Sequence, residues 1–133
     1  MSDELSFEAL ELAIAALEQG LREHEQYPQL LTVRDGVIQR FEIALDVSQK
    51  LMKRVLRDIY NIEPARIAKN TAREAAEMGL IADAEAWIGH IDARNDSAHT
   101  YDNEIAERVF QRIPAFLPDA RALLVRLKNA ANS

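Results

Sequence analysis

One long apolar stripe constrains the fold of this chain more than any other feature. Between residues 30 and 60, apolar side chains recur three or four positions apart, except for one gap of seven after Ala44: Val33, Val37, Phe41, Ala44, Leu51, Val55 and Ile59. This spacing places them on one face of a helix. Four further apolar side chains widen the stripe: Ile38, Leu45, Met52 and Leu56. We therefore expect one long helix over residues 30–60 that is buried on two sides.

Two small residues interrupt this helix. Ser48 falls on the stripe, and its hydroxyl is expected to donate a hydrogen bond to the carbonyl of Ala44. Gly36 costs the helix up to ~1 kcal/mol relative to alanine. A second interpretation of Gly36 is that it lets a neighbouring backbone approach closely.

Helix-start and helix-stop signals frame the other helices. A first helix is capped by Ser6, runs to about residue 25 and ends before Pro28. Residues 61–70 form a connector, and a capping box at residues 71–74 starts a short helix that Gly79 closes. Asp83 caps the next helix.

The last helix begins at an Asp102 cap. Pro114 and Pro118 lie inside it and are expected to kink or briefly break it, because proline removes a backbone donor. No strand-like alternation and no repeat is present. The sequence therefore predicts one all-α domain over residues 1–133: an up-and-down bundle of about five helices with a four-helix-bundle core.

Composition excludes several classes of protein. The chain has 133 residues, of which 48% are hydrophobic, so it can bury a core as a single domain. It contains no cysteine, which excludes disulfides, thiolate metal ligands and cysteine nucleophiles. No apolar run reaches membrane-spanning length, and the first residues are acidic rather than signal-like. We expect a cytoplasmic protein without a membrane partner.

Charge is distributed unevenly along the chain. The net charge is −6, yet residues 28–75 carry nine basic and six acidic side chains. Four of these cations cluster within two helical turns: Lys50, Lys53, Arg54 and Arg57. The preferred interpretation is a solvated face with pairs such as Asp46–Lys50 and Arg54–Asp58. The alternative interpretation is that the cations steer a phosphate toward a nearby site.

Residues 94–101, Arg-Asn-Asp-Ser-Ala-His-Thr-Tyr, concentrate the chemically useful side chains. On a helix, Asn95 and His99 would share one stripe, and Arg94, Ala98 and Tyr101 the next. A cation for phosphate, an imidazole and a phenol would then share a surface. A polar run between two helices is also typical of a solvated helix end without function.

Other kinds of site are not supported by the sequence. The histidines are His24, His90 and His99, and none has a metal-ligand spacing to another. There is no glycine-rich phosphate loop, and no carboxylate pair beside a strand to hold magnesium. We expect no metal and no cofactor. The chain alone is therefore not expected to transfer nucleotides.

The run R-N-x-x-x-H-x-Y, formed by Arg94, Asn95, His99 and Tyr101, resembles the signature of the HEPN superfamily. The chain is similar in particular to the small helical proteins encoded beside minimal nucleotidyltransferases. These were first described as nucleotidyltransferase substrate-binding proteins and later as HEPN toxins of toxin–antitoxin pairs. Three other blocks carry the resemblance: residues 34–42, 73–81 and 87–101.

The resemblance implies a homodimer whose two signatures face each other, and a separately encoded minimal nucleotidyltransferase as partner. It also implies a metal-independent ribonuclease. His99 would exchange protons at neutral pH, Arg94 would stabilise the phosphate, and Asn95 would orient the imidazole or bind phosphate. In the resembled toxins, the tyrosine at the position of Tyr101 receives AMP from the partner, which silences the toxin.

A second hypothesis belongs to a different class of protein. The chain would be a non-catalytic substrate-binding subunit of a two-component nucleotidyltransferase, with Arg94 holding a substrate. Intact Arg94 and His99 favour the ribonuclease, whereas the acidic net charge counts against efficient RNA binding. Degradation of RNA by the purified protein in the presence of a chelator separates the two hypotheses.

Overall fold

The computed structural model describes residues 5–132. Over these residues it has five α-helices, one short 3-10 turn and no strand. The elements are α1 (Glu8–Gln26), α2 (Leu31–Asp58), α3 (Ala68–Glu77), α4 (Ala84–Asp96), η1 (Ser97–His99) and α5 (Asn103–Ala131). The predicted all-α fold of about five helices is confirmed. No helix in the described part of the chain is long and apolar enough to cross a membrane.

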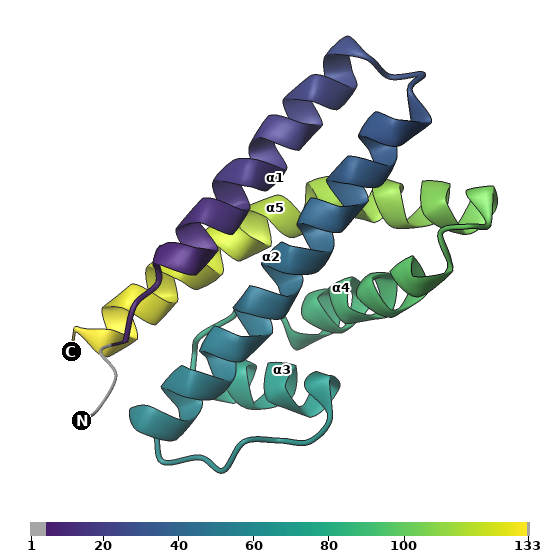
Figure 1. The fold of residues 1–133 in the computed structure, drawn as a ribbon. Coiled ribbons are helices and arrows are strands. Elements are labelled where there is room, and N and C mark those ends of the chain that lie inside the picture. The colour runs from purple at the N-terminus through teal and green to yellow at the C-terminus, as the bar shows by residue number, and fades with distance from the viewer. Residues whose placement is uncertain (1–4, 133) are drawn as a thin grey trace.

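The helices pack around α2. Helices α1 and α2 lie side by side and antiparallel, and α5 crosses against both of them (Figure 1). The short helix α3 and helix α4 cover the remaining side of α2, and α4 also packs against the first half of α5. Helix α2 therefore contacts each of the other four helices, as its wide apolar stripe predicts.

Local signals set three helix ends where the sequence places them. The Asp83 carboxylate accepts hydrogen bonds from the backbone N–H groups of Glu85 and Ala86 at the start of α4. Asp102 does the same at the start of α5. Gly79 has a φ of 79°, the left-handed conformation that glycine adopts readily after a helix.

The start of α3 differs from the prediction. The capping box at Thr71 is wrong, because the helix already begins at Ala68. Thr71 is fully buried, and its hydroxyl has no hydrogen-bond partner in the described structure. The one-turn motif is therefore overridden by the packing of α3 against α2 and α4.

The two prolines of α5 bend the helix without breaking it. One continuous helix spans Asn103–Ala131, and the ribbon changes direction in its middle (Figure 1). Both prolines are exposed, and each removes one backbone hydrogen bond from the helix, which lets the helix bend. The kink at Pro114 and Pro118 is confirmed, and the alternative of a break is wrong.

The core forms where α2, α4 and α5 cross. Phe116 of α5 meets Phe41 of α2 and Trp87 of α4 edge to face, with ring centroids 5.1 Å and 5.6 Å apart. The Ser48 hydroxyl donates to the Ala44 carbonyl at 2.8 Å, as predicted. A Cβ added at Gly36 would meet nothing within 4 Å, so close approach of a neighbouring backbone does not explain this glycine.

Candidate functional site

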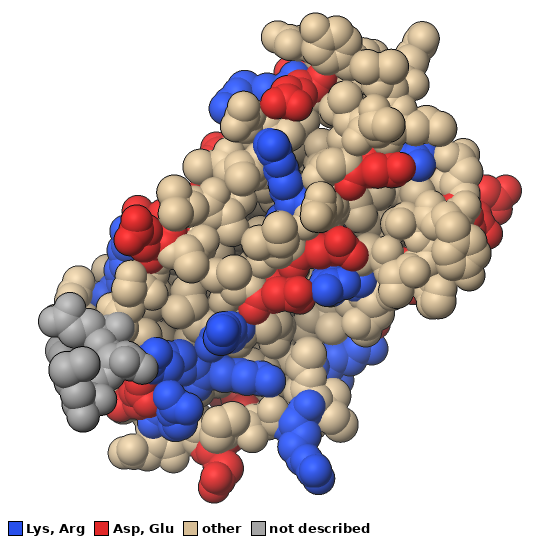
Figure 2. Space-filling model, in the orientation of Figure 1, with Lys and Arg blue, Asp and Glu red and all other residues tan. Residues whose placement is uncertain are grey.

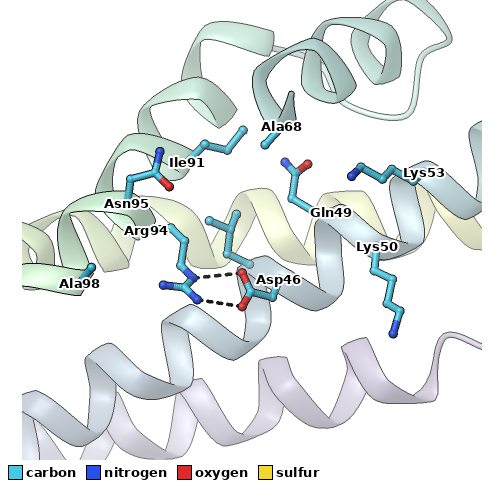
Figure 3. A pocket seen from close by; sticks show the side chains of 10 residues that line it. Asp46, Gln49, Lys50, Lys53, Ala68, Ile91, Arg94, Asn95 and Ala98 are labelled. Atoms are coloured by element: carbon cyan, nitrogen blue, oxygen red, sulfur yellow. Dashed lines mark hydrogen bonds and ion pairs between the residues drawn. The ribbon is translucent and has the colours of Figure 1, made fainter. Parts of the chain in front are cut away.

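The end of α4 is tied to the middle of α2 through one arginine. Nε and Nη2 of Arg94 donate to the two carboxylate oxygens of Asp46, each at a distance of 3.0 Å (Figure 3). Nη1 donates to a carboxylate oxygen of Glu42 at 3.2 Å. Glu42 and Asp46 lie one turn apart on α2, so both face α4. These contacts raise the pKa of Arg94, and the hydrogen bond with Asp46 is the largest cause. Arg94 is a cation fixed to α2.

Ser97 fixes the turn that follows α4. Its side chain is buried, and its hydroxyl donates to the Arg94 carbonyl oxygen at 2.6 Å. The same hydroxyl contacts the Glu42 carboxylate and accepts from Arg94 Nη1 at 3.3 Å. The chain therefore leaves the α-helix at Asp96 and continues as η1.

His99 and Tyr101 lie together on the surface of this turn. Tyr101 is 86% exposed, and His99 is exposed as well. The Tyr101 hydroxyl is 3.5 Å from His99 Nδ1, and the rings are edge to face. The Tyr101 phenol is therefore accessible from solvent. The predicted helical stripe from Arg94 to Tyr101 is wrong, because α4 ends at Asp96.

A buried arginine supports the far end of the same turn. Arg34 of α2 is 4% exposed, and its Nη1 atom donates to the Asn103 side-chain oxygen at 2.7 Å. Asn103 is the first residue of α5 and follows directly after the Asp102 cap. Tyr101 is therefore held between two anchored points, Ser97 and Asn103.

A groove opens beside the Arg94–Asp46 pair, between α2, α3 and α4 (Figure 3). Its volume is about 520 Å³. Its lining residues are Leu45, Asp46, Gln49, Lys50, Lys53, Ala68, Ile91, Arg94, Asn95 and Ala98. Asn95 is exposed in this groove, and its side chain has no hydrogen-bond partner among residues 5–132. Asn95 therefore does not hold the His99 imidazole, whose Nδ1 faces Tyr101 instead.

The four clustered cations of α2 divide into two groups. Arg54 and Arg57 pair with Asp58, which lowers the pKa of that carboxyl, chiefly through the Arg54 hydrogen bond. The predicted Arg54–Asp58 pair is confirmed. The predicted Asp46–Lys50 pair is wrong, because Asp46 binds Arg94. Lys50 and Lys53 both line the groove.

A second polar cluster lies in the core and was not foreseen from the sequence. His90 is fully buried; its Nε2 is 2.7 Å from Asp119 Oδ2, and its Nδ1 accepts from Arg112 Nε at 3.1 Å. Burial is the main cause that lowers the pKa of His90. Within the described residues, no cluster of three or more acidic or histidine side chains has the arrangement of a metal site.

The site residues that sequence reasoning missed are Glu42, Asp46 and Ser97. All three bind Arg94 from within one chain. Glu42 and Asp46 are four positions apart, and this spacing predicts that they share one face of a helix. Which cation that face meets depends on how α2 and α4 pack.

Comparison with known proteins agrees with this fold. The family described as "Nucleotidyltransferase substrate binding protein like" matches residues 5–129, and the chain belongs to this family. The protein named probable ribonuclease HepT, from Haemophilus influenzae, is 35% identical over 139 residues. That match covers 96% of this chain and 95% of the relative.

Two solved structures share the helical arrangement. One, from Haemophilus influenzae, is described as the fold of a substrate binding domain of a nucleotidyltransferase. It is 32% identical with a TM-score of 0.81, covering 92% of this chain and 99% of the other. A crystal structure from Thermus thermophilus is 31% identical with a TM-score of 0.76, covering 89% of this chain and 98% of the other.

Proposed function

We propose that this chain is a metal-independent endoribonuclease of a toxin–antitoxin pair, and that a separately encoded minimal nucleotidyltransferase silences it by transferring AMP to Tyr101. The observation that carries the proposal is the exposed His99–Tyr101 pair on a turn fixed to Arg94. The family description and the relative named probable ribonuclease HepT support it.

The proposed reaction needs a base, an acid and a positive charge. The 2′-hydroxyl of the RNA loses its proton to a base and attacks the adjacent phosphorus. The bond to the 5′-oxygen breaks, and an acid returns a proton to that oxygen. Histidine is the side chain that serves both roles near neutral pH. His99 is exposed and makes no ion pair within residues 5–132, so its imidazole is accessible to substrate.

Arg94 would supply the positive charge while anchored. A guanidinium has five N–H groups, and four of them are used by Asp46, Glu42 and Ser97. One N–H on Nη2 remains for a phosphate oxygen. The two carboxylates reduce the net charge that RNA would meet, so we assign Arg94 mainly to orientation of the phosphate.

One chain offers a single accessible imidazole at this site, which cannot act as base and acid in the same step. We therefore propose a homodimer in which two copies of the turn face each other and each His99 takes one role. A two-fold contact between identical surfaces is the commonest closed assembly. Asn95, on the α4 wall of the groove, is assigned to phosphate binding in this arrangement.

The non-catalytic substrate-binding subunit is the second candidate. It is favoured by one observation: Arg94 is already neutralised by two acidic side chains of its own chain. In that case the turn would present Tyr101 to the nucleotidyltransferase without cleaving RNA.

The test is cleavage of single-stranded RNA by purified protein in a chelating buffer. The parent protein should cleave, and His99→Ala should lose activity by at least ~100-fold, the usual size of a general acid–base contribution. His24→Ala is the matched control, because it removes an imidazole on α1 and should retain activity. Equal activity of the His99→Ala variant contradicts the proposal. An inactive parent protein supports the non-catalytic subunit.

A further inference from the structure

The groove between α2, α3 and α4 combines an apolar floor with a cationic rim. Leu45, Ile91 and Ala98 provide apolar lining, and Lys50 and Lys53 stand on the α2 side. Neither lysine forms a hydrogen bond or an ion pair within the described residues. Figure 3 shows the Lys53 side chain extending toward Gln49, whereas Lys50 extends away from α3 at the rim.

The rim continues along α2 as a basic surface. A second hollow shares Lys50 and Lys53 with the groove and adds Leu51, Arg54, Arg57 and Pro64. Figure 2 shows Lys and Arg side chains gathered over this C-terminal half of α2. The whole chain carries −6, so this surface is a local exception that would attract an anion to the groove.

Gln49 gives an independent indication of a ligand. Its Nε2 and Oε1 atoms are both buried, and neither has a hydrogen-bond partner in the described structure. Buried polar atoms are nearly always paired, so an amide with both atoms unpaired requires an explanation. Gln49 lines the groove from α2, so its unpaired amide lies next to the space that a ligand would occupy.

We infer that this groove is a nucleotide-binding site. The nucleobase lies against Ile91 and Ala98 and pairs with the Gln49 amide, and the phosphate binds Lys53, with Lys50 at the rim. The amide donates and accepts, which suits the edge of a base, and lysine binds phosphate as a point charge. The nucleotide can belong to single-stranded RNA or to a free nucleoside triphosphate. If the nucleotide belongs to RNA, this inference rests on the proposed function; if it is a free nucleoside triphosphate, the inference is independent of that function.

The first experiment measures binding without cleavage. In the His99→Ala background, fluorescence anisotropy follows a labelled single-stranded RNA of about six nucleotides and, separately, labelled ATP. Adding Lys50→Gln and Lys53→Gln should weaken binding about tenfold and reduce the slope of log affinity against log salt by ~1.4, for two lost phosphate contacts. The pair Arg22→Gln and Arg126→Gln removes two charges from exposed sites outside the groove and should change affinity less than twofold.

The two ligands separate the sources of the nucleotide. Loss of RNA binding in the groove variant assigns the site to RNA, and loss of ATP binding alone assigns it to the free nucleotide. The proposal is overturned if neither ligand binds, or if the groove variant and the control variant lose affinity equally. Because the protein carries His99→Ala, a result on the groove does not depend on whether the parent protein cleaves RNA.

Gln49→Leu provides the second experiment. Removing an unpaired buried amide should raise the melting temperature by a few degrees, since the amide no longer lacks partners. Nucleotide affinity should fall at least fivefold. A rise in melting temperature with unchanged affinity would show that the amide has no part in binding and would overturn the proposal.

Discussion

Arg94 and Asp46 form a two-bond pair between helices, although they are 48 positions apart in the sequence. Both bonds are 3.0 Å long, and the carboxylate meets the guanidinium fork as a phosphate would. The Asp46 side chain is 59% exposed and that of Arg94 is 32% exposed. Asp46 therefore holds Arg94 in place and at the same time competes with any phosphate that approaches it.

This competition gives the first prediction. Asp46→Asn removes one negative charge and leaves a single oxygen acceptor for Arg94. RNA affinity, measured by anisotropy in the His99→Ala background, should rise several-fold. Asp92→Asn is the matched control, because it also removes the charge of an exposed carboxylate that forms an ion pair. Asp92 of α4 pairs with Lys69 of α3 and not with Arg94. Weaker RNA binding by Asp46→Asn would mean that the anchoring of Arg94 matters more than the competition.

Two glycines give opposite predictions for stability. A Cβ at Gly36 meets open space, so Gly36→Ala should raise the free energy of unfolding by up to ~1 kcal/mol. A Cβ at Gly89 would lie 2.2 Å from Arg112 Nη2. Gly89→Ala should displace that guanidinium from His90 and the Ala86 carbonyl, and lower the free energy by roughly 1–2 kcal/mol. Urea denaturation of both variants measures the difference, and equal effects would contradict it.

The buried His90 network makes stability depend on pH. Arg112 Nε donates to His90 Nδ1, so His90 Nε2 carries the proton shared with Asp119. Protonation of His90 would place two donors face to face. Burial lowers the pKa of His90 in the folded chain, and the hydrogen bond that His90 donates to Asp119 opposes this shift.

A lowered pKa means that the unfolded chain binds the proton first. The stabilising contribution of neutral His90 should be fully present above pH ~6.5 and lost as the pH falls through the folded pKa, by up to about 1.4 kcal/mol per pH unit. Urea denaturation between pH 5 and 8 tests this. The slope of the free energy of unfolding against pH should be smaller in His90→Gln than in the parent protein and unchanged in His24→Gln. An unchanged slope in His90→Gln would assign the pH dependence to other groups.

The sequence predicted those features that depend on neighbouring residues. The Asp83 and Asp102 caps, the turn at Gly79 and the stripe on α2 follow from local spacing, and all of them are present. The capping box at Thr71 is also a local signal, but α3 begins three residues earlier and buries that threonine. Local preference decides a helix end only where packing does not oppose it.

Contacts between helices could not be predicted from local sequence patterns. Asp46 was assigned to Lys50, four positions away, and the structure pairs it with Arg94 of another helix. His90, Arg112 and Asp119 likewise meet only because α4 packs on α5. The chemistry of Arg94 could be suggested by sequence, whereas the two acids that restrain it depend on the tertiary fold.

The oligomeric state is the next prediction. The wide stripe on α2 gives no support for a dimer, because Ile38, Leu45, Met52 and Leu56 are all buried within one chain. The proposed homodimer therefore rests on the need for two imidazoles in one site. Light scattering at micromolar concentration should give about twice the 15.0 kDa mass of the chain. A monomer that still cleaves RNA would contradict the two-histidine reaction.

The last prediction concerns silencing through Tyr101. Its phenol oxygen would attack the α-phosphorus of ATP on the partner nucleotidyltransferase; pyrophosphate leaves, and the phenol proton goes to solvent. The new phosphate would then sit next to His99, because the Tyr101 hydroxyl is 3.5 Å from its Nδ1. The negative charge and the bulk of the nucleotide would both oppose entry of RNA.

Co-expression with the neighbouring nucleotidyltransferase should therefore add one or more AMP units of ~329 Da each to the chain. The phosphate of each unit brings negative charge, as phosphorylation does. Tyr101→Phe should stay unmodified and toxic in the presence of the partner. Tyr27→Phe is the matched control, because Tyr27 is also exposed, at 54%, but lies at the end of α1 away from His99. Intact-mass spectrometry and growth assays read the two effects. An adduct that persists on Tyr101→Phe and disappears on Tyr27→Phe would move the modification away from the α4–α5 turn and remove Tyr101 from the mechanism.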